Sequence, residues 1–344
     1  MNLTAEQLDE QVCASDGLYK ALTSPIMKLN CLFIIFVILL SYYFSYKALR
    51  TLIHQNIFSE CTRLILLVGS INSIAHQTTM MEIRIRQIYR GFVCEENRCQ
   101  IQFHSSECVY ELYFYYITNF FSTFSLFSLT FDRLIAHFWS NIYSSHQKLI
   151  PFSLLLLQLI LAVSTHLYGF LGVSLAGYVP MCTFPPQLAN NFDTINRFRT
   201  YIMLFCIGIT VFILIFSMKA EKRIHNQVYD TNTRYMAYEN VMTTKTVCLI
   251  IISQFLCIII SSYGITIIRN LQSAIPEDIF HTIVPFLPGV TYANLCLPIV
   301  ICYKTKETIR RRKSTIGEMT AASGSVDTHM EWLTTRGLND SFWE

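Results

Sequence analysis

Seven apolar segments, each near the length that crosses a bilayer, constrain this chain more than any other feature. They cover residues 29–50, 62–82, 109–133, 150–175, 200–219, 246–268 and 281–303. A helix needs about 20 apolar residues to span the hydrocarbon core, and it satisfies its backbone polar groups without water. The pattern predicts an all-α membrane protein in which residues 29–303 form a bundle of seven transmembrane helices.

The composition favours one polytopic membrane domain over two soluble domains. Hydrophobic residues make up 52% of the chain and charged residues only 14%, whereas soluble chains carry about 25% charged residues. Acidic residues precede the first apolar segment, so we expect this segment to stay as a span and not to be cleaved as a signal peptide. The second segment is the least apolar, because Asn72, His76 and Gln77 lie within it.

The positions of lysine and arginine predict the orientation. With the N-terminus outside, most of the 26 basic residues fall in the inner connections and the C-terminal tail, as the positive-inside rule requires. An outer connection over residues 83–108 also holds several arginines, which weakens this bias. We expect residues 1–28 to be an extracellular tail and residues 304–344 to be a cytoplasmic tail.

The cytoplasmic tail begins with a basic cluster over residues 304–313. A cluster of this kind beside a membrane helix attracts anionic lipid headgroups, or it serves only as a positive-inside anchor. Ser314 and Thr315 follow it and are candidates for phosphorylation by a kinase that prefers basic sites. The polar residues 316–344 are expected to be disordered.

The cysteines expected on the outer side are Cys13, Cys94, Cys99, Cys108 and Cys182. Disulfides form in this oxidising environment, which disfavours a zinc site built on reduced thiolates. Five cysteines cannot all pair within one chain. Cys94 and Cys99 could close a small loop, or one of them could hold the N-terminal tail through Cys13.

The centres of the seven segments contain no Asp, Glu or Lys. This argues against a proton-coupled transporter, a membrane metallohydrolase and a retinal Schiff base, which need such residues within the membrane. The sequence also has no Gly-rich phosphate loop and no nucleophile elbow. We expect a protein that is not an enzyme, has no cofactor or metal, and does not bind nucleic acid.

The third segment carries a candidate ligand-binding face. Tyr115, Asn119 and Ser122 recur at helical spacing on one side of it. Aromatic walls with a few polar groups are typical of small-molecule pockets, and they are also typical of plain helix packing. His76 and His166 lie within other segments, either as functional groups or as neutral histidines hydrogen-bonded between helices.

The layout resembles that of a G-protein-coupled receptor. Cys108 stands 25 residues before Arg133, and a second cysteine, Cys182, lies between the fourth and fifth segments. Similarity to rhodopsin-like receptors implies a Cys108–Cys182 disulfide and a G-protein coupling role for Asp132 and Arg133. Leu134 stands where those receptors have tyrosine, and their marks in the second, sixth and seventh spans are absent. Without the resemblance, the charged pair is equally an interface anchor.

A closer resemblance is to the nematode serpentine receptor class alpha family. It rests on the opening Cys13-Ala14-Ser15-Asp16 with Leu22-Thr23-Ser24, and on the third-segment run from Ser128 to Leu134. The resemblance implies a chemosensory receptor in the plasma membrane, and in the ciliary membrane of sensory neurons. Such a receptor binds an external small molecule and activates a heterotrimeric G protein. The alternatives are a heptahelical ligand-gated ion channel and a membrane transporter.

Overall fold

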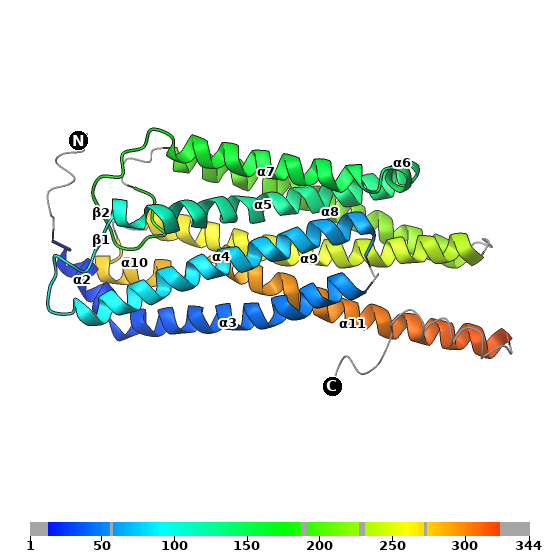
Figure 1. The fold of residues 1–344 in the computed structure, drawn as a ribbon, viewed down its shortest axis with the longest axis horizontal. Helices are drawn as coiled ribbons and strands as arrows, with labels where there is room; N and C mark the ends of the chain where they lie inside the picture. Colours follow the sequence, from blue (N-terminus) through cyan, green and yellow to red (C-terminus); the bar gives the residue numbers. More distant parts are fainter. Residues whose placement is uncertain (1–12, 56–57, 187–190, 227–230, 272–273, 324–344) are drawn as a thin grey trace.

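The computed structural model describes residues 13–55, 58–186, 191–226, 231–271 and 274–323. In this part of the chain, long helices run side by side along one axis (Figure 1). These helices are α3 (Pro25–His54), α4 (Glu60–Val93), α5 (Val109–Phe138), α7 (Leu149–Phe170), α8 (Phe192–Asn226), α9 (Thr231–Asn270) and α11 (Gly289–Ser323). The expected all-α membrane architecture is therefore correct, and each of the first six predicted segments overlaps one of these helices.

Short elements cover the two ends of the bundle (Figure 1). One end carries α2 (Asp16–Thr23), α10 (Glu277–Ile283) and a two-stranded antiparallel ribbon of β1 (Phe103–His104) and β2 (Tyr178–Val179). The opposite end carries α6 (Ser140–Ser145). The first end also holds both disulfides, and disulfides persist in oxidising compartments. We therefore call it the outer end and the opposite one the inner end.

Several predicted segment boundaries are wrong. The fourth segment runs past the end of α7 at Phe170, and the fifth begins after the start of α8 at Phe192. The second segment does not stop at residue 82, because α4 continues to Val93 and so turns much of the expected outer loop into helix. The seventh segment, 281–303, is not one helix. It consists of α10, a 3-10 turn (Val284–Phe286) and then α11. Pro285 and Pro288 lie at this break, and proline lacks the N–H that a continuous helix would need.

Helices α4 and α5 are the polar centre of the bundle. By length and composition alone, five of the described helices qualify as membrane spans, and α4 and α5 are not among them. Helix α5 contacts α4, α7, α8 and α9. A helix surrounded by other helices needs less apolar surface than one that faces lipid, and polar side chains can hydrogen-bond across its interfaces. Their lower hydropathy therefore fits a seven-span bundle with α5 inside.

A proline in α11 ties three helices together. Pro298 has no N–H for the carbonyl of Asn294, one turn earlier. That carbonyl instead accepts hydrogen bonds from Ser41 on α3 and Ser73 on α4, each at 3.2 Å. Gln77 adds a donor from α4 to the backbone carbonyl of Thr291, at 2.9 Å. The polar residues of the second segment thus stabilise the irregular backbone of the seventh.

The outer disulfides join Cys108 to Cys182 and Cys13 to Cys99. The first is the pair that the resemblance implied. Of the two arrangements left open for Cys94 and Cys99, the small loop between them is wrong. The bond to the N-terminal tail is present, because Cys99 pairs with Cys13 and Cys94 keeps a free thiol. Through that bond the expected tail is held on the bundle: α2 lies within it and packs on α10. Residues 1–12 lie outside the described residues.

The basic cluster continues the last helix towards the inner side. Helix α11 runs to Ser323, so Ser314 and Thr315 lie on it. Residues 316–323, expected to be disordered, are therefore helical, and residues 324–344 lie outside the described part. This stretch contains Glu, Met and two Ala, which favour helix, so polarity alone misjudged it.

Candidate ligand cavity and coupling site

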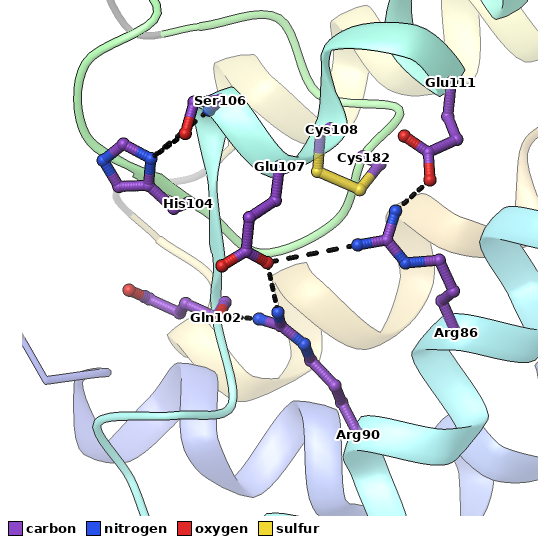
Figure 2. The surroundings of a disulfide bond; sticks show 9 residues. All are labelled: Arg86, Arg90, Gln102, His104, Ser106, Glu107, Cys108, Glu111 and Cys182. Carbon is purple, nitrogen blue, oxygen red and sulfur yellow. Dashed lines mark hydrogen bonds and ion pairs between the residues drawn. A yellow bond between two sulfur atoms is a disulfide. The ribbon is translucent and has the colours of Figure 1, made fainter.

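An ionic network holds the start of α5 against α4 at the outer end. Figure 2 shows Arg86 and Arg90 of α4 reaching towards Glu107 and Glu111, beside the disulfide that begins α5. Arg86 bonds to Glu111 and lies 4.0 Å from Glu107, while Arg90 bonds to Glu107. Two of the arginines that weakened the predicted charge bias are therefore neutralised by neighbouring carboxylates.

A partly open cavity of about 660 Å³ is lined by residues of α4, α5, α8, α9 and the break before α11. Its volume lies in the range of small-molecule sites, roughly 300–1,000 Å³. The segment that follows Cys182 forms part of its wall, through Thr183, Phe184 and Pro185. Because the disulfide fixes that segment to the top of α5, it also fixes this wall of the cavity.

Two of the three predicted pocket residues line this cavity. Tyr115 and Asn119 are in its wall. Ser122 is not among the lining residues: it lies about one helical turn further in and accepts a hydrogen bond of 2.8 Å from Asn72. His76 is fully buried behind the wall, with Nδ1 3.1 Å from the Thr118 hydroxyl and its ring 5.1 Å from that of Tyr115. It joins α4 to α5, as the packing interpretation of His76 required.

His166 lies apart from the cavity. Its ring is on α7 and packs against Tyr113 and Phe170, with ring centroids 5.2 and 4.9 Å away. The structure therefore separates the two intramembrane histidines and gives them unrelated surroundings.

Four arginines line the cavity, Arg84, Arg197, Arg199 and Arg269, and the sequence interpretation singled out none of them as a site residue. Arg197 and Arg269 are exposed, so the two that lie deeper are Arg84 and Arg199. Arg84 on α4 is 2% exposed and donates to Gln87 Oε1 and to the Pro285 carbonyl, each at 3.0 Å. Arg199 on α8 donates to Asn119 Oδ1 and to Ser262 Oγ, each at 3.1 Å. They were missed because the second segment was ended before Arg84 and the fifth was begun after Arg199. Each of these two arginines lies within one helical turn of a predicted apolar segment. That position could have indicated that the helix continues through the arginine.

The inner end of α5 holds a closed charged cluster. Asp132 and Arg133 are 0% and 1% exposed, and Arg133 donates through Nε and Nη2 to Asp132 Oδ2 at 3.0 and 2.8 Å. Thr62 on α4 donates to the same oxygen at 2.8 Å. Tyr143 on α6 donates to Asp132 Oδ1 and accepts from Arg133, both at 2.9 Å. The pair is therefore buried and connected to two neighbouring elements, and is not an exposed interface anchor.

Leu134 stands where rhodopsin-like receptors have a tyrosine, and it has no hydroxyl. In this chain the hydroxyl in the cluster comes from Tyr143 instead. Burial raises the pKa of Tyr143, so its hydroxyl remains protonated and can donate to the carboxylate. With its guanidinium enclosed in this way, Arg133 cannot reach a partner at the inner surface. We call this cluster of Asp132, Arg133, Tyr143 and Thr62 the inner latch. Its hydrogen bonds would have to break before Arg133 could contact another protein.

Comparison with known proteins identifies the chain. Residues 8–336 match the family described as "Serpentine type 7TM GPCR chemoreceptor Sra". The chain belongs to the Sra family. Three relatives from Caenorhabditis elegans agree: serpentine receptor class alpha-20 is 51% identical over 334 residues, class alpha-17 is 52% identical over 333, and class alpha-18 is 50% identical over 335. Each alignment covers 97% of this chain and 98% of the relative.

Membership in the Sra family confirms the resemblance read from the two short sequence patches. It makes the chain a multi-pass membrane receptor of the seven-span chemoreceptor type, and a receptor rather than an enzyme. In this Sra receptor the outer cavity and the inner latch lie on one helix, α5.

Replacing Tyr143 with phenylalanine should weaken the latch. The change removes one donor to Asp132 and one acceptor for Arg133, and a hydrogen bond to a charged group contributes about 1.5–3 kcal/mol. We expect a lower thermal midpoint of the purified receptor and a higher ligand-independent rate of nucleotide exchange. Tyr46→Phe, at a 66% exposed residue, is the matched control and should leave both values unchanged.

Proposed function

We propose that this Sra receptor binds an external small molecule in the outer cavity and activates a heterotrimeric G protein at the inner end of α5. The observation that carries the proposal is that one helix serves both sites. Tyr115 and Asn119 line the cavity, and Arg133 lies 14 residues further along. At about 1.5 Å per residue, this separation is roughly 21 Å, which a rigid helix can bridge.

A ligand would act by binding one arrangement of the helices more tightly than another. Arg199 joins α8 to Asn119 on α5 and to Ser262 on α9, so a ligand beside it contacts three helices at once. A change in their packing would reach the inner ends of the same helices. Release of Arg133 from Asp132 and Tyr143 would then offer a cation to the G protein, together with the inner ends of α8 and α9.

The remaining expectations concern the setting of the receptor. We propose residence in the plasma membrane, including the ciliary membrane of sensory neurons, which the chemoreceptor description of the family supports. The basic start of the tail would contact anionic lipid headgroups, and phosphorylation of Ser314 or Thr315 would reduce that attraction.

The direct test uses membranes from cells that express the full chain together with a G protein. A panel of candidate odorants and water-soluble compounds is applied, and nucleotide exchange on the G protein is measured. We expect exchange that depends on both compound and receptor. A compound-gated current that persists without any G protein would favour the channel alternative, and saturable uptake of a labelled compound would favour the transporter. An N-terminal tag inaccessible on intact cells would contradict the orientation.

A further inference from the structure

The cavity is lined by cations without matching acids. Its described lining holds Arg84, Arg197, Arg199 and Arg269 and contains no Asp or Glu. Arg197 and Arg269 are exposed, whereas Arg84 and Arg199 lie deeper. The four shortest hydrogen bonds of Arg84 and Arg199 all go to neutral partners. These partners are the side chains of Gln87, Asn119 and Ser262 and the backbone carbonyl of Pro285. Weaker contacts of Arg84 to Asn30 Oδ1 at 3.5 Å and to Met181 Sδ at 3.7 Å are also neutral.

Each of these arginines keeps an unused donor. The Nε atoms of Arg84 and Arg199 are buried and have no hydrogen-bond partner among the described atoms. A buried guanidinium is costly unless it is paired and its donors are satisfied. An anion bound in the cavity would supply the missing partner to either guanidinium.

The neighbouring arginines of α4 show what a structural role looks like in this chain. Arg86 and Arg90 lie outside the cavity wall, and each bonds to a glutamate. The fold therefore provides carboxylates for the arginines that hold its outer end together. Arg84, on the same helix and more deeply buried, receives none from the described residues.

We infer that the ligand of this receptor is an organic carboxylate whose anionic group binds Arg199 and Arg84. Arg guanidinium and carboxylate match as a forked, charge-assisted pair. The apolar body would lie against the aromatic wall of Tyr115, Tyr116 and Phe184. This inference rests on the proposed role of the cavity as the ligand site, and it names the chemical class of that ligand.

The mode of action follows from the contacts of Arg199. Its two Nη atoms hold Asn119 of α5 and Ser262 of α9. A carboxylate that binds this guanidinium competes with or reorients these two hydrogen bonds. An anionic ligand would thereby change the link among α5, α8 and α9, whereas a neutral analogue of the same shape would not.

A carboxylate introduced on the protein itself, next to Arg199, tests the inference even though the ligand is unidentified. Asn119→Asp changes the partner of Arg199 from an amide to a carboxylate of the same size. We expect the thermal midpoint of the purified full-length receptor to rise by roughly 2–4 °C. Asn72→Asp is the matched control, since Asn72 bonds to Ser122 and the Thr118 carbonyl, and should lower the midpoint. A fall in both variants would overturn the inference.

A second arm uses carboxylates directly. The probes are straight-chain acids from butanoate to dodecanoate with benzoate and phenylacetate, each paired with its primary amide. At least one acid should raise the midpoint of the wild-type receptor while its amide does not, and Arg199→Gln and Arg84→Gln should each weaken its apparent affinity by about 10–100-fold. Arg98→Gln is the control: this partly exposed arginine pairs with Asp16 outside the cavity. Equal stabilisation by acids and amides, or by none, counts against a carboxylate site.

The two proposals fail separately. Binding is measured on the purified receptor, where no G protein is present. Carboxylate binding without nucleotide exchange would sink the coupling proposal and keep the ligand class. A neutral compound that drives exchange equally in wild type and Arg199→Gln would sink the ligand class and keep the coupling.

Discussion

Replacing Cys182 with serine is expected to reduce the amount of folded receptor at the cell surface severely. The bond to Cys108 spans a sequence separation of 74 residues, and loss of a native disulfide costs about 2–5 kcal/mol, with the larger values for long loops. The loss also frees the segment from Thr183 to Pro185 that walls the cavity. We therefore expect surface receptor to fall several-fold and the remaining receptor to lose its ligand response, measured by surface labelling and by nucleotide exchange.

Cys94→Ser provides the matched control. Cys94 lies at the same outer end, is half-buried and has a free thiol. Its replacement removes a sulfur without removing a crosslink, so surface amount and response should stay close to wild type. Alkylation of Cys108 in the native receptor would contradict the assigned bond, as would a Cys182→Ser receptor that behaves like the control.

Apolar length was sufficient to predict the helices but not their ends. Seven segments of about 20 residues can be satisfied only by helices in lipid, so the fold class followed from the sequence. The continuation of α4 to Val93 carries Arg84, Arg86 and Arg90, and Arg86 and Arg90 pair with Glu111 and Glu107. Such partners belong to the tertiary structure, and a hydropathy window cannot contain them.

The cysteine pairing shows a different limit. Cys94 and Cys99 are close in sequence, and both were compatible with a bond to Cys13. The choice depends on where the loop meets α2, where Ala14 donates its N–H to the Arg98 carbonyl at 3.2 Å. That contact brings Cys13 beside Cys99, and nothing in the spacing of the cysteines favours it over Cys94.

The sequence predicted some residues of the candidate site and missed others. Helical spacing placed Tyr115 and Asn119 on one face, and both line the cavity. Arg199 was excluded because it directly precedes an apolar run, although α8 begins seven residues before it. A search restricted to Asp, Glu and Lys in span centres could not find a cavity whose charges are arginines near the span ends.

Replacing Arg133 with alanine is expected to abolish ligand-stimulated nucleotide exchange. In the latched state Arg133 is 1% exposed and bonded to Asp132 and Tyr143, so its charge is available only after the latch opens. The variant loses the cation proposed to contact the G protein. Exchange per surface receptor should fall by about tenfold or more, and ligand-induced stabilisation of the purified receptor should persist, because the cavity lies at the other end of α5.

Asp132→Asn should act in the opposite direction and so separates a signalling role from simple damage. Removing one partner of a buried ion pair costs about 3–5 kcal/mol, because the remaining charge is left uncompensated. Here the cost falls on the latched state, in which Arg133 is enclosed, and much less on an open state, in which it meets water or a partner. Ligand-independent exchange per surface receptor should therefore rise in Asp132→Asn and stay absent in Asp132→Asn with Arg133→Ala. If all three variants lose exchange in proportion to a lower thermal midpoint, the cluster stabilises the fold and does not couple it to a G protein.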